Sequence, residues 1–354
     1  MGAWVVVRIL IFSDLHLHNH VYGATLIEGV NSRLLDGAAV LDQIAEYVYV
    51  NPVDEIVFCG DLFHTHGKLD ATVLKVAFEG FDNIRLLHGK PYHITALVGN
   101  HDTADKTMQT HAMHWLDALG VNVVDGAWHN GAKTSGLPAD LSFLAYTESV
   151  DEIQQFLNDA AAKGGNPVCF LHAGVDGVPM KSGFVPGSAF NTGMIPAGIQ
   201  HVFSGHYHPH MRVTDKATVV GTPLQLNWAD EGDTRGFLIY DTDTGVIEQI
   251  PIYAPKFVTY NMTNALRLGR QVQDEVEGNF VRVINYDPAF QEDIRREFSE
   301  AGARSVEFVV KVEAVERMQP LSSDDLQLSE IIKEYEEQKN VTPERSKVGE
   351  ELRK

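Results

Sequence analysis

Short apolar runs recur along the chain, and each one gives way to a cluster of polar residues. The runs are rich in Val, Ile and Phe, and they cover residues 5–12, 55–60, 93–99, 167–172 and 201–205. Runs of this length and composition are typical of buried β-strands. We therefore expect at least five buried strands.

Apolar residues between these runs recur at helical spacing. They lie three or four positions apart from Leu34 to Val48, and again from Ile153 to Ala160. Buried strands that alternate with amphipathic helices predict an α/β fold. Two later segments, 218–223 and 236–252, read as hairpin strands, and the second has its turn at residues 242–245.

The pattern divides the chain into three parts. Pro251 and Pro255 mark the end of the first part. A strand at 279–286, a helix that starts near Pro288 and a strand at 305–312 then form a small β-α-β unit. The predicted domains are a main domain at 1–255, this unit as a cap at 256–320, and a charged helical tail at 321–354.

Composition places the chain among ordinary globular proteins, with 44% hydrophobic and 21% charged residues in a length of 354. Cys59 and Cys169 lie inside apolar runs, so we expect buried thiols and a reducing compartment, the cytoplasm. The N-terminal run is broken by Arg8, and no run approaches the ~18 residues of a membrane helix. We expect neither a signal peptide nor a membrane span.

The formal net charge is −20, from 28 Lys and Arg against 48 Asp and Glu. A protein that holds nucleic acid by bulk electrostatics alone needs an excess of basic residues. Bound metal ions can reverse the charge locally. The charge therefore does not exclude action on DNA, but it indicates that a partner supplies part of the affinity.

Five polar motifs stand at the ends of the predicted strands. They are Asp14-Leu15-His16, Gly60-Asp61-Leu62-Phe63-His64, Gly99-Asn100-His101-Asp102, His172 and Gly205-His206-Tyr207-His208. A single Asp-x-His or Gly-Asp pair occurs by chance in most proteins of this size, and a lone histidine is more often a core residue. All five motifs in this order are hard to explain by packing, because burying so many polar groups without a partner is costly.

The motifs offer carboxylate, amide and imidazole ligands for two divalent metal ions. The expected ligands are Asp14, His16, Asp61, Asn100, His172, His206 and His208. Two divalent cations beside two carboxylates leave about two positive charges, which suits a phosphodiester better than a cationic substrate. Mixed imidazole and carboxylate ligation favours Mn²⁺, Fe or Zn²⁺ over Mg²⁺.

The ordered motifs resemble those of the calcineurin-like metallophosphoesterase superfamily. This resemblance implies two mixed β-sheets packed face to face with helices outside. Residues 219–241 also resemble the segment that follows the last histidine motif in SbcD-type nucleases and in phage recombination endonuclease subunits. The matching residues of this segment are Gly221, Thr222, Glu231, Arg235, Gly236 and Phe237. Outside the segment, His64, three residues after Asp61, also matches.

The resemblance assigns the ligands to two metal positions that share Asp61. The first position adds Asp14, His16 and His208, and the second adds Asn100, His172 and His206. His101 would bind no metal but would face the scissile phosphate and protonate or stabilise the leaving oxygen. His64 would orient His101 or the phosphate.

The first metal loop departs from the family pattern. After Leu17 the family usually has glycine, whereas this chain has His18, Asn19 and His20. Extra ligation by His18 and His20 stays open, but solvated loop residues are the simpler interpretation. The other histidines have no motif partner and are expected to be structural or exposed: His66, His88, His93, His111, His114, His129, His201 and His210.

The resemblance implies an Mn²⁺-dependent DNA exonuclease and single-strand endonuclease, a homodimer in an SbcCD-like repair or recombination complex. The chain has no Gly-x-x-x-x-Gly-Lys-Ser/Thr loop, so ATP binding would belong to an SbcC-like ATPase of the SMC family. We expect this partner to dock on residues 321–354, which carry an apolar stripe from Leu328 to Tyr335. The alternative is a tail that folds back on its own domain.

Two other functions stay open. One is a small-molecule phosphodiesterase or phosphatase of the same superfamily, and the other is a metal-bearing scaffold without catalysis. The segment 219–241, the cap and the tail favour the nuclease over the former. The presence of His101 beside a full ligand set argues against the latter.

Overall fold

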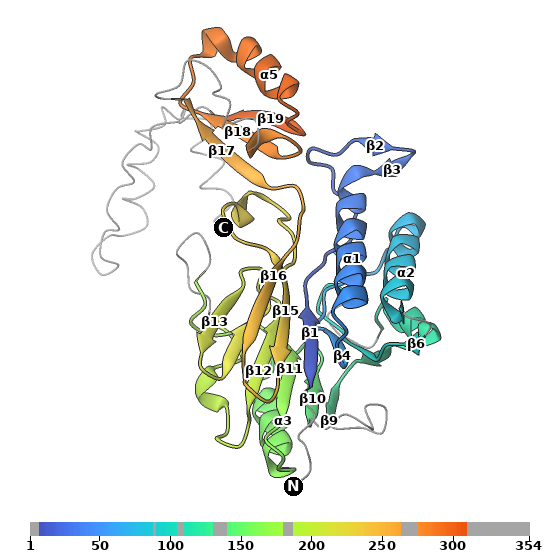
Figure 1. Cartoon of the computed structure of the whole chain (residues 1–354). Coiled ribbons are helices and arrows are strands. Elements are labelled where there is room, and N and C mark those ends of the chain that lie inside the picture. Colours follow the sequence, from blue (N-terminus) through green and yellow to red (C-terminus); the bar gives the residue numbers. More distant parts are fainter. Residues whose placement is uncertain are drawn as a thin grey trace, which may run out of the picture. The chain divides into compact units, whose positions relative to one another are not determined.

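Strands from distant parts of the chain form two six-stranded sheets (Figure 1). The computed structural model describes residues 7–87, 90–104, 110–129, 140–179, 187–262 and 275–309. The first sheet contains, in spatial order, β16 (Ile247–Pro251), β15 (Gly236–Asp241), β1 (Arg8–Phe12), β4 (Glu55–Phe58), β7 (Ile94–Leu97) and β8 (Asn122–Val124). The second contains β13 (Met211–Thr214), β14 (Ala217–Val219), β12 (His201–Gly205), β11 (Val168–His172), β10 (Leu141–Leu144) and β9 (Ala127–His129).

Both sheets are mixed. In the first, β1, β4, β7 and β8 are parallel, whereas the β15–β16 hairpin pairs antiparallel to β1. In the second, β10, β11, β12 and β14 are parallel, with β9 and β13 antiparallel at the edges. Parallel neighbours end at the same edge of a sheet, and ligands of α/β sheets bind at that edge.

The two sheets pack face to face through apolar side chains, which confirms the predicted fold class. The layer between them includes Ile9, Ile11, Val57, Leu97 and Leu238 from the first sheet and Leu141, Phe143, Val168, Phe170 and Phe203 from the second. Phe203 meets Tyr240 of β15 across the layer, with ring centroids 5.1 Å apart. Full burial of each large apolar side chain stabilises the fold by roughly 1.5–3 kcal/mol.

Helices cover the outer faces of the sheets. α1 (Ser32–Val50) and α2 (Ala71–Arg85) pack on the first sheet, and α3 (Val150–Ala162) packs on the second. The helices predicted near 34–48 and 151–162 are thus confirmed. A polar side chain caps the N-terminus of each helix and accepts backbone N–H groups of the first turn, which stabilises a helix by ~1 kcal/mol.

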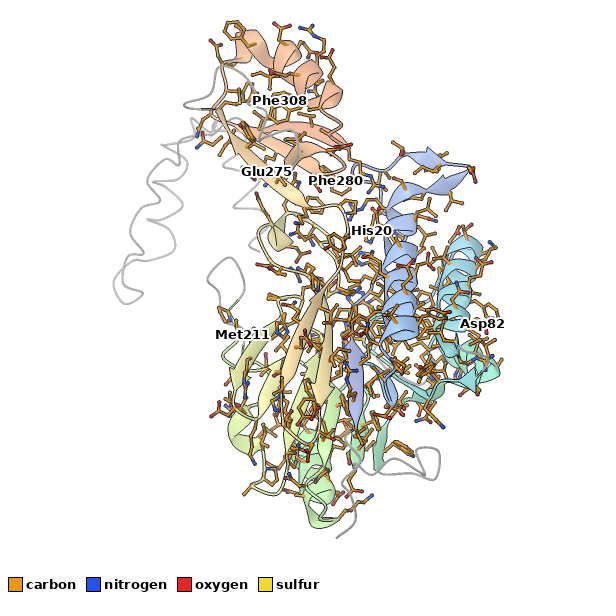
Figure 2. All side chains as sticks on the ribbon, viewed as in Figure 1. His20, Asp82, Met211, Glu275, Phe280 and Phe308 are labelled. Carbon is orange, nitrogen blue, oxygen red and sulfur yellow. The ribbon has the colours of Figure 1, made fainter. Side chains whose placement is uncertain are left out.

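A three-stranded parallel sheet follows the main domain. β17 (Phe257–Asn261), β18 (Phe280–Ile284) and β19 (Ser305–Val309) pair in this order, and α5 (Gln291–Glu300) packs on them through Ile294 and Phe298. The predicted β-α-β unit corresponds to β18, α5 and β19, and β17 is an additional strand. Figure 2 labels Phe280 and Phe308 among its side chains.

Short elements complete the described parts of the chain. They are the strand pairs β2 (Leu26–Ile27) with β3 (Val30–Asn31) and β5 (Leu86–Leu87) with β6 (Lys90–Pro91), and the 3₁₀ turns His114–Leu119, Thr192–Met194, Trp228–Asp230 and Pro288–Phe290. The described residues all belong to one compact unit. The predicted tail at 321–354 lies outside the described residues. Among the described helices, none has the length and apolar character to span a membrane.

Candidate metal centre

The predicted metal ligands stand on loops with an unusual backbone conformation. Asp14, His16, Asp61 and His206 have φ angles of 54°, 47°, 59° and 89°. Residues other than glycine rarely adopt this left-handed region, which costs of order 1–3 kcal/mol and persists only where the surroundings enforce it. Four such residues within one predicted ligand set point to loops that are held for function.

Backbone contacts hold the first two loops against each other. The N–H of Asp14 donates to the carbonyl of Gly60 at 2.9 Å, and that of His16 donates to Asp61 at 3.1 Å. Gly60 has a φ of +98°, and a Cβ there would lie 2.4 Å from Nδ1 of His172. Only glycine therefore lets His172 approach the second loop.

Asp102 links the loop that follows β7 to the loop that follows β4. Its buried carboxylate accepts backbone N–H groups at 2.9 to 3.1 Å from Gly99, Asp61, Leu62 and Phe63. Burial raises the pKa of Asp102 to about 7, with help from the charge of Asp61 and against these hydrogen bonds. The side chain thus organises two metal loops without joining either ligand group.

The first group of ligands comprises Asp14, His16 and His208, whose ligand atoms all lie within 4.8 Å of one another. Nε2 of His208 faces Nε2 of His16 at 3.3 Å. The backbone N–H of His206 donates to both carboxylate oxygens of Asp14 at 3.1 Å. These bonds fix the orientation of the Asp14 carboxylate.

The second group comprises Asp61, His172 and His206, again within 4.8 Å. Asn100 joins it through Oδ1, which lies 2.9 Å from Nδ1 of His206 and 3.2 Å from Nε2 of His172. Nδ1 of His172 lies 2.6 Å from the carbonyl oxygen of Cys59 and donates to it. The lone pair of Nε2 in the neutral ring is then free for a metal ion.

Asp61 lies between the two groups. Its Oδ2 is 3.4 Å from Nε2 of His172 and 3.7 Å from Nε2 of His16. A carboxylate in this place can bridge two ions. The structure therefore brings all seven predicted ligands together, in the two sets that the sequence resemblance implied.

Two of the imidazoles are held neutral. Burial lowers the pKa of His16 well below its ordinary value, and burial together with the nearby His172 lowers that of His206 to about 4. A neutral imidazole offers a lone pair, which is the form that binds metal ions.

The pKa values of the other ionisable ligands are also shifted. Burial disfavours the charge of His172, but Asp61 and Asp14 outweigh burial and raise the pKa of His172 to about 9. Burial likewise opposes the charge of His208, yet Asp230 and Asp14 raise its pKa. Burial raises the pKa of Asp14 to about 6. The pKa of Asp61 falls below its usual range, because His172 and His16 overcome the effect of burial.

This donor set fits divalent cations. Two imidazole nitrogens that face each other at 3.3 Å need a proton or a cation between them, and His16 holds a proton poorly. Burial of Asp14, His16, Asp61 and His172 also demands compensating charge. Imidazole, amide and carboxylate groups are all common ligands of divalent metal ions.

His101 stands beside the ligands. Its backbone N–H donates to Oδ1 of Asp61 at 2.8 Å, and its Nδ1 lies 2.7 Å from the backbone carbonyl of His64. Its ring meets that of His16 edge-on at 4.7 Å. His64 thus orients His101 through its carbonyl oxygen, while the two rings stack at 5.7 Å.

Three further histidines lie closer to the site than expected. The rings of His18 and His20 are half-buried and contact the ring of His64 at 5.3 and 4.9 Å, so their assignment as solvated loop residues is wrong. His66, which has no motif partner, stacks on His101 at 4.9 Å. His201 is buried and bonded to Thr218 at 2.9 Å, as expected of a structural residue.

Residues 219–241, the segment that resembles SbcD-type nucleases, contact His208. The carbonyl of His208 accepts the N–H of Thr222 at 3.0 Å and also a bond from Arg235. Arg235 pairs with Oδ1 of Asp230 at 2.8 Å, and this oxygen lies 3.8 Å from Nδ1 of His208. The segment therefore supports a metal ligand.

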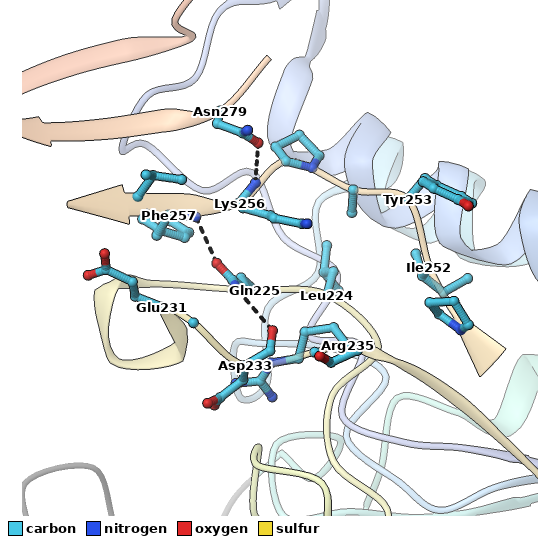
Figure 3. A pocket seen from close by; sticks show the side chains of 16 residues that line it. Leu224, Gln225, Glu231, Asp233, Arg235, Ile252, Tyr253, Lys256, Phe257 and Asn279 are labelled. Atoms are coloured by element: carbon cyan, nitrogen blue, oxygen red, sulfur yellow. Dashed lines mark hydrogen bonds and ion pairs between the residues drawn. The ribbon is translucent and has the colours of Figure 1, made fainter. Parts of the chain in front are cut away.

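The same segment, residues 219–241, also forms hydrogen bonds to β17, the first strand of the cap. Figure 3 shows Gln225 between Phe257 and Asp233: its Oε1 accepts the N–H of Phe257 at 2.7 Å, and its Nε2 donates to the carbonyl of Asp233 at 3.2 Å. Glu231 accepts two bonds from Thr259 of β17. One loop thus links the cap to the surroundings of His208.

Sequence patterns assigned no role to three residues of the site: Asp102, which closes the third motif, Asp230 and Tyr146. Tyr146 follows β10, and its ring lies 5.6 Å from that of His206 and 5.9 Å from that of His172. The apolar run Leu141–Leu144 was a signal for this strand end, because it resembles the other strands in composition. Asp102 lay inside the third motif, whereas Asp230 left no comparable signal.

Comparisons with known proteins agree with this geometry. A family model described as calcineurin-like phosphoesterase matches residues 7–210, which include all seven predicted ligands. Exonuclease subunit 1 of Enterobacteria phage T4 is 26% identical over 230 residues, which are 63% of this chain and 62% of that protein. A protein named as phosphoesterase 078R of Invertebrate iridescent virus 3 is 39% identical over 79 residues, which are 21% of this chain and 22% of that one.

The chain thus matches less than two thirds of the length of these relatives. Among solved structures, the calcineurin-like phosphoesterase YfkN of Bacillus subtilis aligns with a TM-score of 0.35 and 14% identity, over 70% of this chain and 89% of that one.

Proposed function

This chain belongs to the calcineurin-like phosphoesterase family, and we propose that it is an Mn²⁺-dependent DNA nuclease that acts as an exonuclease and a single-strand endonuclease. The observation that carries the proposal is the place of Asp61, whose Oδ2 lies within 3.7 Å of a nitrogen from each ligand group. Two divalent ions held by these residues would stabilise both the attacking and the leaving oxygen of a displacement at phosphorus.

The choice of DNA over a small substrate has two supports. Residues 221–237 carry the pattern of SbcD-type nucleases and surround His208. The relative from phage T4 is named as an exonuclease subunit.

His101 supplies the acid in this mechanism. Its Nδ1 donates to the His64 carbonyl, so a proton on Nε2 is the one available for transfer. In hydrolysis, the oxygen of a water molecule adds to phosphorus and the bond from phosphorus to the leaving oxygen breaks. The leaving oxygen then takes a proton from Nε2 and departs as the product alcohol. The attacking water releases a proton to solvent, and His101 regains one from solvent, so the protons balance.

The acidic composition supports the proposal of a partner. With 28 basic against 48 acidic residues, the chain is poorly suited to hold duplex DNA alone. We propose a homodimer in the cytoplasm that works with an SbcC-like ATPase.

The test uses the purified chain with Mn²⁺ and linear DNA. Asp61→Ala should abolish cleavage and lower occupancy at both metal positions, because the shared ligand is lost. His101→Ala should keep near-normal metal content and cleave at least ~10²-fold more slowly. Elemental analysis and a gel-based nuclease assay measure both quantities, and the exposed His114→Ala serves as the control.

Two results would contradict the proposal. If Asp61→Ala retains two full metal equivalents, the bridging assignment is wrong. If the wild-type chain hydrolyses a bis-aryl phosphodiester but cleaves no DNA, with or without the ATPase, a small-molecule phosphodiesterase is the better description.

A further inference from the structure

Tyr146 stands at the edge of the metal centre on a rigid backbone. Its N–H donates to the carbonyl of Val98 at 2.9 Å, and the N–H of Ala145 donates to Gly126 at 3.0 Å. The end of β10 is thereby tied to the first sheet. The side chain is half-buried and projects from a fixed position.

The ring of Tyr146 is also fixed. Its hydroxyl donates to Oε1 of Glu148 at 2.5 Å. Its face is tilted by 35° to the ring of His206, with centroids 5.6 Å apart. If a nucleotide binds with its phosphate at the metal centre, an aromatic ring this close to two metal ligands can contact the base of that same nucleotide.

A cavity of about 640 Å³ opens along this ring. Its lining includes Asn100 and His66 on the side of the metal centre, and Tyr146, Thr147, Glu148 and Asp125 elsewhere. The volume lies within the usual range of small-molecule sites. Asn100 places the cavity directly beside the second ligand group.

The residues that line the cavity disfavour a phosphate group and suit a nucleobase. No lysine or arginine is among the described residues that line the cavity, whereas Asp125, Glu148 and Glu152 are. Carboxylates repel phosphate groups but accept hydrogen bonds from the N–H groups of bases. Aromatic side chains stack on nucleobases whatever their sequence.

We propose that this cavity receives the nucleobase adjacent to the scissile phosphate, and that Tyr146 stacks on it. The inference rests on the proposed nuclease function and assigns it a substrate subsite. Tyr146 acts here as a specificity residue, because it distinguishes a nucleotide from a phosphoester without a base.

The test compares two ligands of the Mn²⁺-loaded protein by calorimetry: deoxyadenosine 5′-monophosphate, and methyl phosphate, which lacks sugar and base. The wild type should bind the nucleotide more tightly. Tyr146→Leu should weaken nucleotide binding about tenfold and leave methyl phosphate unchanged. Tyr146→Phe keeps the ring and should retain the preference, so it is the matched control.

The result that overturns the subsite is an unchanged nucleotide preference in Tyr146→Leu. An equal loss for both ligands also overturns it, because the ring would then act only by supporting His206 and His172. Elemental analysis of Tyr146→Leu should show two metal equivalents, and loss of one would assign the ring to that same structural role.

The outcomes separate this inference from the proposed function. If the chain cleaves DNA but shows no Tyr146-dependent preference for the nucleotide, the subsite is wrong and the nuclease stands. If the preference depends on Tyr146 but DNA is not cleaved, the subsite stands and the substrate is a smaller nucleotide ester.

Discussion

At the scale of single residues, buried carboxylates decide how the metal ligands are held, and Asp230 is the clearest case. One oxygen lies 3.8 Å from Nδ1 of His208, and the other accepts the N–H groups of Leu226 and Asn227 at 2.8 and 3.2 Å. A carboxylate beside the second nitrogen of a ligating histidine fixes the ring and strengthens the first nitrogen as a donor. Asp230 is therefore a positioning residue for His208.

We predict that Asp230→Asn weakens metal binding about 10- to 100-fold at one of the two positions and spares the other. A Mn²⁺ titration followed by electron paramagnetic resonance measures each position. The matched control is Asp233→Asn, since Asp233 pairs with the same Arg235 at 2.9 Å from a more exposed place. An equal loss at both positions, or the same loss in the control, would reduce Asp230 to a support of the fold.

The ligands could be predicted from the sequence, whereas their supports could not. Asp14, Asp61 and His172 follow apolar strands, and strand ends are recognisable in one dimension. Asp102 and Asp230 matter because of what lies opposite them in space, and local sequence carries no record of such partners. His18 and His20 were read as solvated for the same reason.

At the scale of elements, periodicity predicted the strands and helices that repeat an apolar pattern clearly. The hairpin of β15 and β16 and the helices α1 and α3 are examples. α2 was overlooked, although Val73, Ala77, Phe81 and Ile84 form its buried stripe and Asp70 caps it. Short strands such as β8 and β9 depend on neighbours for their pairing, so sequence alone gave little sign of them.

A buried carboxylate in β4 gives the element scale its own prediction. Glu55 is fully buried and Oε1 accepts a bond from Thr95 at 3.0 Å, while Oε2 has no partner among the described residues. Burial raises the pKa of Glu55 to about 7, against the effect of Thr95. The folded state therefore holds a proton that the unfolded chain releases above its ordinary pKa of 4.5.

This difference makes stability fall as pH rises from about 4.5 to about 7. Glu55→Gln removes the titration and should stabilise the metal-free protein by about 3 kcal/mol at pH 8.5, with little change at pH 4.5. Thermal unfolding in EDTA at both pH values measures the change in stability. Glu79→Gln on the exposed face of α2 is the control. If Glu55→Gln gained the same stability at both pH values, burial of the Glu55 carboxylate would not be the cause.

At the scale of the whole molecule, the net charge bears on how the proposed nuclease would bind DNA. The site gathers ligands for two cations, yet the chain as a whole carries −20. Phosphate neutralisation by Lys and Arg supplies most non-specific DNA affinity, and here acidic residues outnumber basic ones. Hydrolysis of a small diester should thus be intrinsic to the chain, while efficient cleavage of DNA should need a basic partner surface.

We predict that residues 321–354 dock that partner through their apolar stripe of Leu328, Ile331, Ile332 and Tyr335. Deletion of the segment should leave hydrolysis of bis(p-nitrophenyl) phosphate unchanged, and should abolish co-purification with an SbcC-like ATPase and ATP-stimulated DNA cleavage. Replacing the four apolar residues by serine should do the same, because it keeps the charge and removes the anchors. If either variant still binds the ATPase, docking lies elsewhere. If deletion sharply lowers the melting temperature, the tail instead stabilises its own domain.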